Sequence, residues 1–176
     1  MKYVLIFLAL FISFCFSAQV GKVFPPIQGK TLDDKLISVP SKNGKYSVIA
    51  IAFSRQAEDD LKKWLNPLFQ TFIKDEKENN KGMDMADVYD VNFVFVPMIT
   101  GFKRIADEFK KDTDPQFWKY IMDTEKTDIN SLQKSRLIED SKIPYFFVLD
   151  ASGKVLEVQS GKFLPAKIDK LEDAIE

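Results

Sequence analysis

Residues 46–64, YSVIAIAFSRQAEDDLKKW, carry the strongest structural signal in the chain. The first half is a nearly continuous apolar run with several β-branched residues, which is typical of a central strand buried on both faces. From Leu61 onward, apolar residues recur at three- and four-residue spacings, which predicts one face of a helix. Ser54 is the expected N-cap, because its side chain can accept a hydrogen bond from the first helical turn. The stretch therefore predicts a strand, a short polar turn and a helix.

The middle of the chain continues this alternation of helices and strands. Pro67 lies inside the helical pattern, and we expect a kink or break near Asn66 because proline removes a backbone donor. Residues 74–85 are charged and have no apolar period, so they predict a solvated loop or an extended helix end. The run VNFVFV at 91–96 predicts a second strand. Residues 101–111 predict a short helix.

The C-terminal part predicts two further helices and a hairpin. Asp114 and Pro115 are a good helix start, with aspartate as cap and proline at the first helical position. The apolar face expected for this helix comprises Phe117, Trp118, Ile121 and Met122. The strand YFFVLD at 145–150, a turn and the strand KVLEVQ predict a hairpin. A final helix is expected over residues 164–175.

The beginning of the chain beyond residue 18 predicts a small hairpin. Residues 30–40, KTLDDKLISVP, contain two short alternating runs around Asp33 and Asp34. The order of elements is then ββ, βα, βα, ββα. This order predicts an α/β domain with a mixed central sheet, helices on both faces and an N-terminal β-hairpin. The length suits one domain, which we expect to span residues 19–176.

Residues 1–18 have the pattern of a secretory signal peptide: one lysine, an apolar core and a small pair at the end. The core is short for a membrane span. We expect cleavage after Ala18, with cleavage after Ser17 or an uncleaved anchor as alternatives. Acylation of Cys15 is disfavoured because bulky Phe14 precedes it. The segment predicts a periplasmic or secreted protein.

Composition excludes several classes of function. With 25 basic and 26 acidic residues, the chain has no basic excess to attract nucleic acid. Cys15 is the only cysteine and there is no histidine, so the cleaved chain would lack thiol nucleophiles, imidazole bases and Cys or His metal ligands. The acids at 58–60 are expected to compensate the helix dipole, and Asp84, Asp87 and Asp90 lack the pattern of a calcium loop. We expect no cofactor and no metal.

Two positions are candidates for recognition. Arg55 stands between a buried strand and a helix N-terminus, where side chains often face a ligand or partner, and its guanidinium could bind a carboxylate bidentately. An ordinary surface arginine is the alternative. Ile143 and Pro144 open a strand, where a proline removes one ladder bond and can be cis. Simple strand initiation with a trans bond is the alternative there.

Three stretches together resemble the thioredoxin-like superfamily, in particular its peroxiredoxin and thiol-reductase-like branch. They are FPPIQGKTLDDKLISVP at 24–40, YSVIAIAFS at 46–54 and IPYFFVLDASGKV at 143–155. In that family the proline before the late strand is cis, which implies a cis Pro144. The family places its redox cysteines in the turn and first helical residues, which here fall within 55–61. No sulfur stands there, so the resemblance implies a redox-inactive member.

A narrower resemblance points to a function. The stretch FSRQAEDDLKKWLNPLF at 53–69 is similar to the thioredoxin-like family of mitochondrial ATP synthase assembly chaperones, which also lacks paired cysteines in this turn. This narrower resemblance implies a role in helping a membrane subunit to assemble. Together with the predicted signal peptide and the missing sulfur, the fold resemblance leads us to expect a redox-inactive protein of the cell envelope that binds a protein or an extended peptide segment, as a chaperone or assembly factor. Membrane association would arise only through an uncleaved signal or a membrane-protein client.

The expected binding site is a groove with two lips. Ile143, before Pro144, would offer its backbone to an extended peptide. Ser54, Arg55 and Gln56 would form the opposite lip. The alternatives are a thiol oxidoreductase or peroxidase-related protein, which needs a sulfur or selenium that the cleaved chain lacks, and a small-molecule binder in the same groove.

Overall fold

The computed structural model describes residues 19–74, 89–97, 103–124 and 126–175. Its elements are β1 (Ile27–Thr31), β2 (Leu36–Val39), β3 (Ser47–Ile51), α2 (Arg55–Phe69), a π-helical turn (Gln70–Lys74), β4 (Asn92–Val96), α4 (Lys103–Asp112), η3 (Pro115–Tyr120), β5 (Met122–Thr124), α5 (Lys126–Lys134), β6 (Tyr145–Leu149), β7 (Val155–Ser160) and α6 (Pro165–Asp173). The expected signal peptide and nearly all of the charged stretch 74–85 lie outside the described residues. Among the described helices, none is long and apolar enough to cross a membrane.

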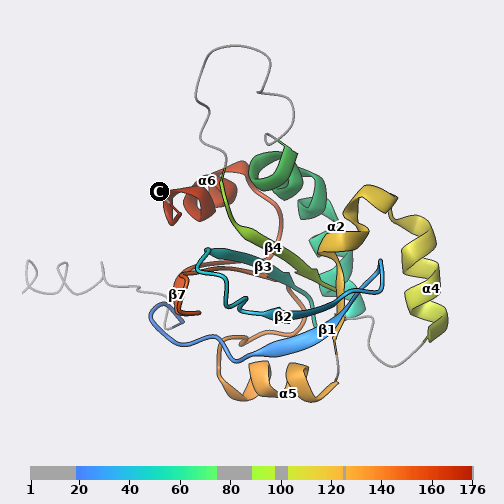
Figure 1. The fold of residues 1–176 in the computed structure, drawn as a ribbon, viewed down its shortest axis with the longest axis horizontal. Coiled ribbons are helices and arrows are strands. Elements are labelled where there is room, and N and C mark those ends of the chain that lie inside the picture. The colour runs from blue at the N-terminus through green and yellow to red at the C-terminus, as the bar shows by residue number, and fades with distance from the viewer. Residues whose placement is uncertain (1–18, 75–88, 98–102, 125, 176) are drawn as a thin grey trace, which may run out of the picture.

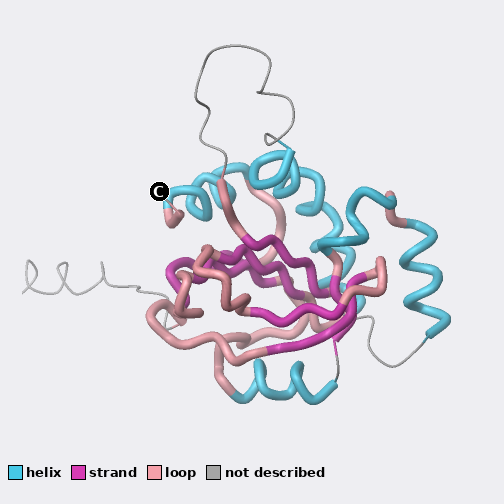
Figure 2. The backbone as a smooth tube through the Cα atoms, in the orientation of Figure 1, coloured by secondary structure: helices cyan, strands magenta, loops and turns pink. Residues whose placement is uncertain are grey.

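The central sheet has four strands in the order β4-β3-β6-β7 (Figures 1 and 2). Strand β3 runs parallel to β4 and antiparallel to β6, and β6 forms a hairpin with β7. Every residue of β3 and β6 is buried, as the continuous apolar runs predict. The mixed sheet expected from the sequence is therefore confirmed.

A second sheet contains the expected N-terminal hairpin and one strand that the sequence did not predict. Its order is β2-β1-β5, and all neighbours are antiparallel. A bridge between Phe95 and Ile121 connects this sheet to β4 of the central sheet. Strand β5 is therefore the strand of the second sheet that lies nearest to β4.

The helix expected after Asp114 begins where predicted but ends early. Asp114 caps it by accepting a hydrogen bond from the Gln116 N–H at 3.0 Å, yet only the 3₁₀ helix η3 forms. The Leu32 N–H donates to the carbonyls of Trp118 and Ile121, which ties the end of η3 to the β1–β2 hairpin. The expectation that Ile121 and Met122 lie on a helix face is wrong: Met122 begins β5, and Ile121 forms the bridge to β4.

Helix α2 passes through Pro67 without a break. Ser54 caps the helix as expected, because its hydroxyl accepts the Ala57 N–H at 3.2 Å. Of the expected kink or break near Asn66, the break does not occur. Leu68 and Phe69 are buried in the core beyond the proline, and this burial holds the chain helical through the position that lacks a donor.

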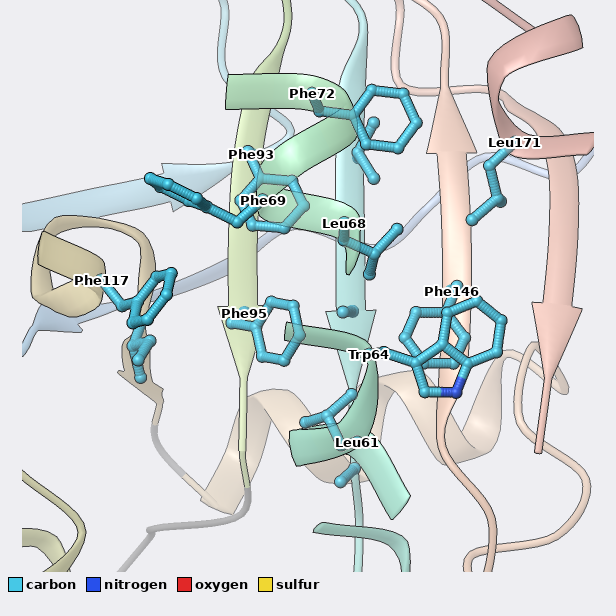
Figure 3. Close-up of a cluster of buried hydrophobic side chains, with 14 of the residues drawn as sticks. Leu61, Trp64, Leu68, Phe69, Phe72, Phe93, Phe95, Phe117, Phe146 and Leu171 are labelled. Carbon is cyan, nitrogen blue, oxygen red and sulfur yellow. The ribbon is translucent and has the colours of Figure 1, made fainter. Parts of the chain in front are cut away.

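The two faces of the central sheet pack into two separate hydrophobic clusters. Helices α2 and α6 cover one face, while the N-terminal hairpin and α5 lie over the other (Figure 1). Figure 3 shows the first cluster, in which Leu61, Trp64 and Leu68 of α2 lie against Phe95 and Phe146 of the sheet. Helices on both faces are therefore confirmed.

Candidate functional site

Both lips of the expected site lie at the same end of the central sheet. The register pairs Ile51, the last residue of β3, with Tyr145, the first residue of β6. Residues 54–56 follow the end of β3, and residues 143–144 precede the start of β6. The structure therefore brings together the two segments, which are about 90 residues apart in the sequence.

The β3–β6 ladder ends here, at the pair Ile51 and Tyr145. The Ala52 N–H donates to the Val96 carbonyl at 3.1 Å, so Ala52 belongs to the β4 side. Beyond this last pair, the chain bends at Phe53 and at Ile143. Counted two residues further along each chain, the same register matches Phe53 with Ile143, and both side chains pack with the same cluster. In an antiparallel ladder the N–H and C=O of such a pair point toward each other.

Neither residue of that pair uses its backbone groups within the described part of the chain. The backbone hydrogen bonds there include none to the N–H or C=O of Phe53 or Ile143. We call these two residues with their unbonded backbone groups the fork. A fork of this kind offers two donors and two acceptors just beyond the last paired residues of the two strands.

The α2 side of the fork carries two exposed polar side chains, Arg55 and Gln56. Arg55 takes part in no ion pair with any residue the structure describes. Ser54 is half-buried, and its hydroxyl is engaged as the helix cap. Of the three residues expected on this lip, Arg55 and Gln56 are available to a partner and Ser54 is structural.

The β6 side is held by the loop before it. The Tyr145 hydroxyl accepts the backbone N–H groups of Glu139 and Asp140, at 3.2 and 2.9 Å. The Asp140 carboxylate accepts the Lys142 N–H at 2.8 Å. The loop is thus fastened up to the residue before Ile143, while Ile143 itself keeps its backbone groups unbonded within the described ranges.

Pro144 is buried and its peptide bond is trans. Among the described residues the cis bond is Val39–Pro40, so the cis Pro144 implied by the resemblance is wrong. Pro144 continues β6 as extended backbone, and its carbonyl accepts the Gly161 N–H at 2.9 Å. Pro144 and Gly161 therefore extend the pairing of β6 with β7 by one residue pair.

Two of the three acids at the start of α2 pair with lysines of the same helix. Glu58 pairs with Lys62 at 2.9 Å and Asp60 pairs with Lys63 at 2.7 Å. Lys62 also lies over the Phe109 ring, 4.9 Å from its centre. Across the described ranges, no group of three His, Cys, Asp or Glu side chains converges to hold a metal ion.

Phe53 of the fork was not among the residues expected from the sequence. Its apolar side chain is typical of a core residue, and the residue is buried, with 5% of its surface exposed. Its contribution is the backbone, which no side-chain pattern reveals. Only the register of β3 against β6 identifies it.

Comparison with known proteins identifies the fold. No family model matches the chain, and no curated protein matches it either. Among solved structures, the thioredoxin domain of a thiol-disulfide oxidoreductase from Bacteroides vulgatus is similar with a TM-score of 0.60 and 17% identity, over 91% of this chain and 100% of that chain.

Two further structures agree. A thioredoxin-family thiol:disulfide interchange protein from Chlorobium tepidum has a TM-score of 0.56 and 21% identity, over 89% of this chain and 97% of its own. An exposed lipoprotein thioredoxin from Streptococcus pneumoniae has a TM-score of 0.52 and 15% identity, over 85% and 99%. At these identities the likeness concerns architecture. The chain has a thioredoxin-like fold.

Proposed function

We propose that this chain is a redox-inactive thioredoxin-like protein of the cell envelope that binds an extended segment of a protein partner. The observation that carries the proposal is the fork: Phe53 and Ile143 have backbone groups without partners in the described part of the chain, at the end of a buried sheet. Extended peptides can bind unpaired backbone groups of this kind through main-chain hydrogen bonds. The resemblance to ATP synthase assembly chaperones supports a chaperone or assembly role.

The energetics favour an extended peptide over a compact ligand. Each main-chain hydrogen bond contributes about 0.5–1.5 kcal/mol net, so a segment that uses both sides of the fork gains several kcal/mol before any side chain binds. Arg55 then adds a charge-assisted bond to a carboxylate or carbonyl of the partner. A small-molecule ligand would use the same atoms but bury less surface.

The location proposed is periplasmic or secreted. The apolar segment at 1–18 supports it, as does the fold likeness to a pneumococcal protein described as an exposed lipoprotein. Thiol–disulfide exchange is the second candidate function, because the similar structures include thiol-disulfide oxidoreductases. That chemistry needs a thiolate, and the sole cysteine is Cys15, inside the predicted signal peptide. A disulfide-reduction assay with turnover above background would favour this second candidate.

Site-directed photo-crosslinking in intact cells tests the binding proposal. A photoreactive phenylalanine derivative replaces Arg55, and captured proteins are identified by mass spectrometry. The matched control replaces Lys42, another exposed cation, which lies before β3 at the opposite end of the strand. One dominant envelope protein captured from position 55 and absent from position 42 is the expected result. Equal and diffuse capture from both positions would rule out the fork as the binding site.

Once a partner is known, charge substitutions test the role of Arg55. Arg55→Ala should weaken the affinity roughly tenfold or more, as expected for a hydrogen bond to a charged group. Lys42→Ala removes the same charge at the other end of the sheet and should leave affinity unchanged. Equal affinities for the two variants would show that Arg55 is an ordinary surface residue.

A further inference from the structure

Gly161 connects the two sides of the site through its single peptide unit. It follows β7 with φ of +78°, a left-handed conformation that favours glycine. Its N–H donates to the Pro144 carbonyl at 2.9 Å, and its own carbonyl accepts the indole N–H of Trp64 at 3.1 Å. One residue therefore joins the start of β6 to α2, the helix whose first turn carries Arg55.

Pro144 leaves the Gly161 carbonyl free to accept the hydrogen bond from Trp64. In a complete antiparallel rung, residue 144 would donate its N–H to the Gly161 carbonyl. Pro144 has no N–H, so that carbonyl receives no donor from β6. The Trp64 indole supplies one instead. Trp64 is fully buried and lies flat against Phe146, with ring centres 3.9 Å apart (Figure 3).

Lys167 of α6 fastens the residues on either side of Gly161. Its ammonium donates to the carbonyl of Ser160 at 2.6 Å and to that of Lys162 at 3.0 Å. It also lies over the Trp64 ring, 5.9 Å from its centre. Three consecutive carbonyls, those of 160 to 162, are thus held by side chains of two helices. We call Trp64, Gly161 and Lys167 the clamp.

We propose that Trp64 and Lys167 are positioning residues for the fork. Through Gly161 they hold Pro144 against β7, and this keeps the adjacent Ile143 apart from Phe53 so that the fork stays open in the free protein. The inference rests on the proposed function, because it assigns the clamp a role in that binding. A site that is already open avoids the cost of reorganisation when the partner binds.

Three substitutions in the full-length chain test the clamp. Trp64→Phe keeps an aromatic ring against Phe146 but removes the indole donor. Lys167→Met keeps the side-chain stem but removes the ammonium, and Lys167→Arg restores a cation in the same place. Lys167 is half-buried at the molecular surface, so its variants serve even if Trp64→Phe folds poorly.

Two readouts are compared in each variant. The first is the deuterium-exchange rate of the Gly161 amide, with the Ile49 amide in the middle of β3 as a measure of global stability. The second is the yield of the dominant product captured by the photoreactive group at position 55. Trp64→Phe and Lys167→Met should each speed Gly161 exchange and reduce capture, by roughly three- to tenfold, while Ile49 exchange changes less. Lys167→Arg should recover most of both.

The outcomes separate the clamp from the function that it serves. Unchanged Gly161 exchange in both variants would overturn the clamp, whatever the capture yield. Faster Gly161 exchange with unchanged capture would overturn the positioning role, because the clamp would then be merely structural. A wild-type chain that captures nothing selectively would overturn the proposed function, and the positioning role with it, while the exchange rates would still show whether the clamp holds Pro144.

Discussion

Replacing Gly29 by alanine should destabilise the protein severely, because β1 and β5 approach each other too closely for a side chain. A Cβ atom at Gly29 would lie 1.9 Å from the carbonyl oxygen of Asp123 and 2.8 Å from Cγ of Met122. The first of these is a backbone atom, which cannot rotate out of the way. Restoring an ordinary contact would require β5 to move by roughly 1.5 Å, which is enough to break the hydrogen bonds between the two strands.

The magnitude follows from these losses. Forcing an extra methyl group into a packed interior costs about 1–3 kcal/mol. Each ladder bond lost adds about 0.5–1.5 kcal/mol, and the bond from the Thr124 hydroxyl to the Gln28 carbonyl, 2.8 Å long, lies in the same ladder. We therefore expect a loss of at least about 3 kcal/mol, or a fall in Tm of roughly 6–12 °C for a domain of this size.

Thermal and urea unfolding followed by circular dichroism measure the effect, with Gly44→Ala as the matched control. Gly44 has φ of +81°, so alanine there should cost about 1 kcal/mol from backbone strain, but its Cβ would meet nothing within 4 Å. The reasoning depends on the difference between the two variants. If Gly29→Ala is no less stable than Gly44→Ala, β1 and β5 do not approach each other as described.

Two further predictions concern the start of α2 and a half-buried carboxyl group. Ser54→Ala removes the cap on the Ala57 N–H and should cost about 0.5–2 kcal/mol in urea unfolding; an unchanged midpoint would exclude the cap. Asp123 has a buried Oδ1 with no hydrogen-bond partner among the described residues, and burial raises the pKa of its carboxyl. Asp123→Asn should therefore be more stable than the wild type at pH 7. The folded chain holds the Asp123 proton more tightly than the unfolded chain, so the stability advantage of the variant should shrink as pH falls through the raised pKa. An equal difference in urea midpoint between variant and wild type at pH 7 and at pH 4 would contradict this reasoning.

The strands of the central sheet could be predicted from the sequence because their signal is local. Strands β3 and β6 are each five consecutive buried residues, and a short apolar run rich in β-branched and aromatic residues favours a strand over a helix. Strand β5 has three residues, and its conformation depends on pairing with β1, which lies about 90 residues earlier. The helix start at Asp114 was correctly located because its signal is also local. The place where η3 ends was not, because the Leu32 N–H that bonds the end of η3 comes from a distant part of the chain.

The exposed side chains of the candidate site could be placed from the sequence, but its backbone groups could not. Arg55 and Gln56 are exposed at the end of β3, as the strand–turn–helix pattern indicates. The part of the fork that carries the binding proposal depends on which residue faces Ile143 across the sheet, and that requires the register. Trp64 read as an ordinary core residue because its helical spacing is apolar. Its indole N–H donates to the Gly161 carbonyl, a contact across 97 residues that the apolar spacing does not reveal.

The lack of sulfur in residues 54–61, at the start of α2, is compatible with the binding proposed here, because the two activities use different atoms. Disulfide exchange requires a sulfur at the helix start, whereas strand addition requires unbonded N–H and C=O groups on neighbouring backbones. The fork is made of the backbones of Phe53 and Ile143, so most of its affinity would not depend on the sequence of the bound segment. Selectivity would come from Arg55 and Gln56 beside it. A site of this kind suits partners that share an extended conformation more than a sequence, which is the requirement that a chaperone has to meet.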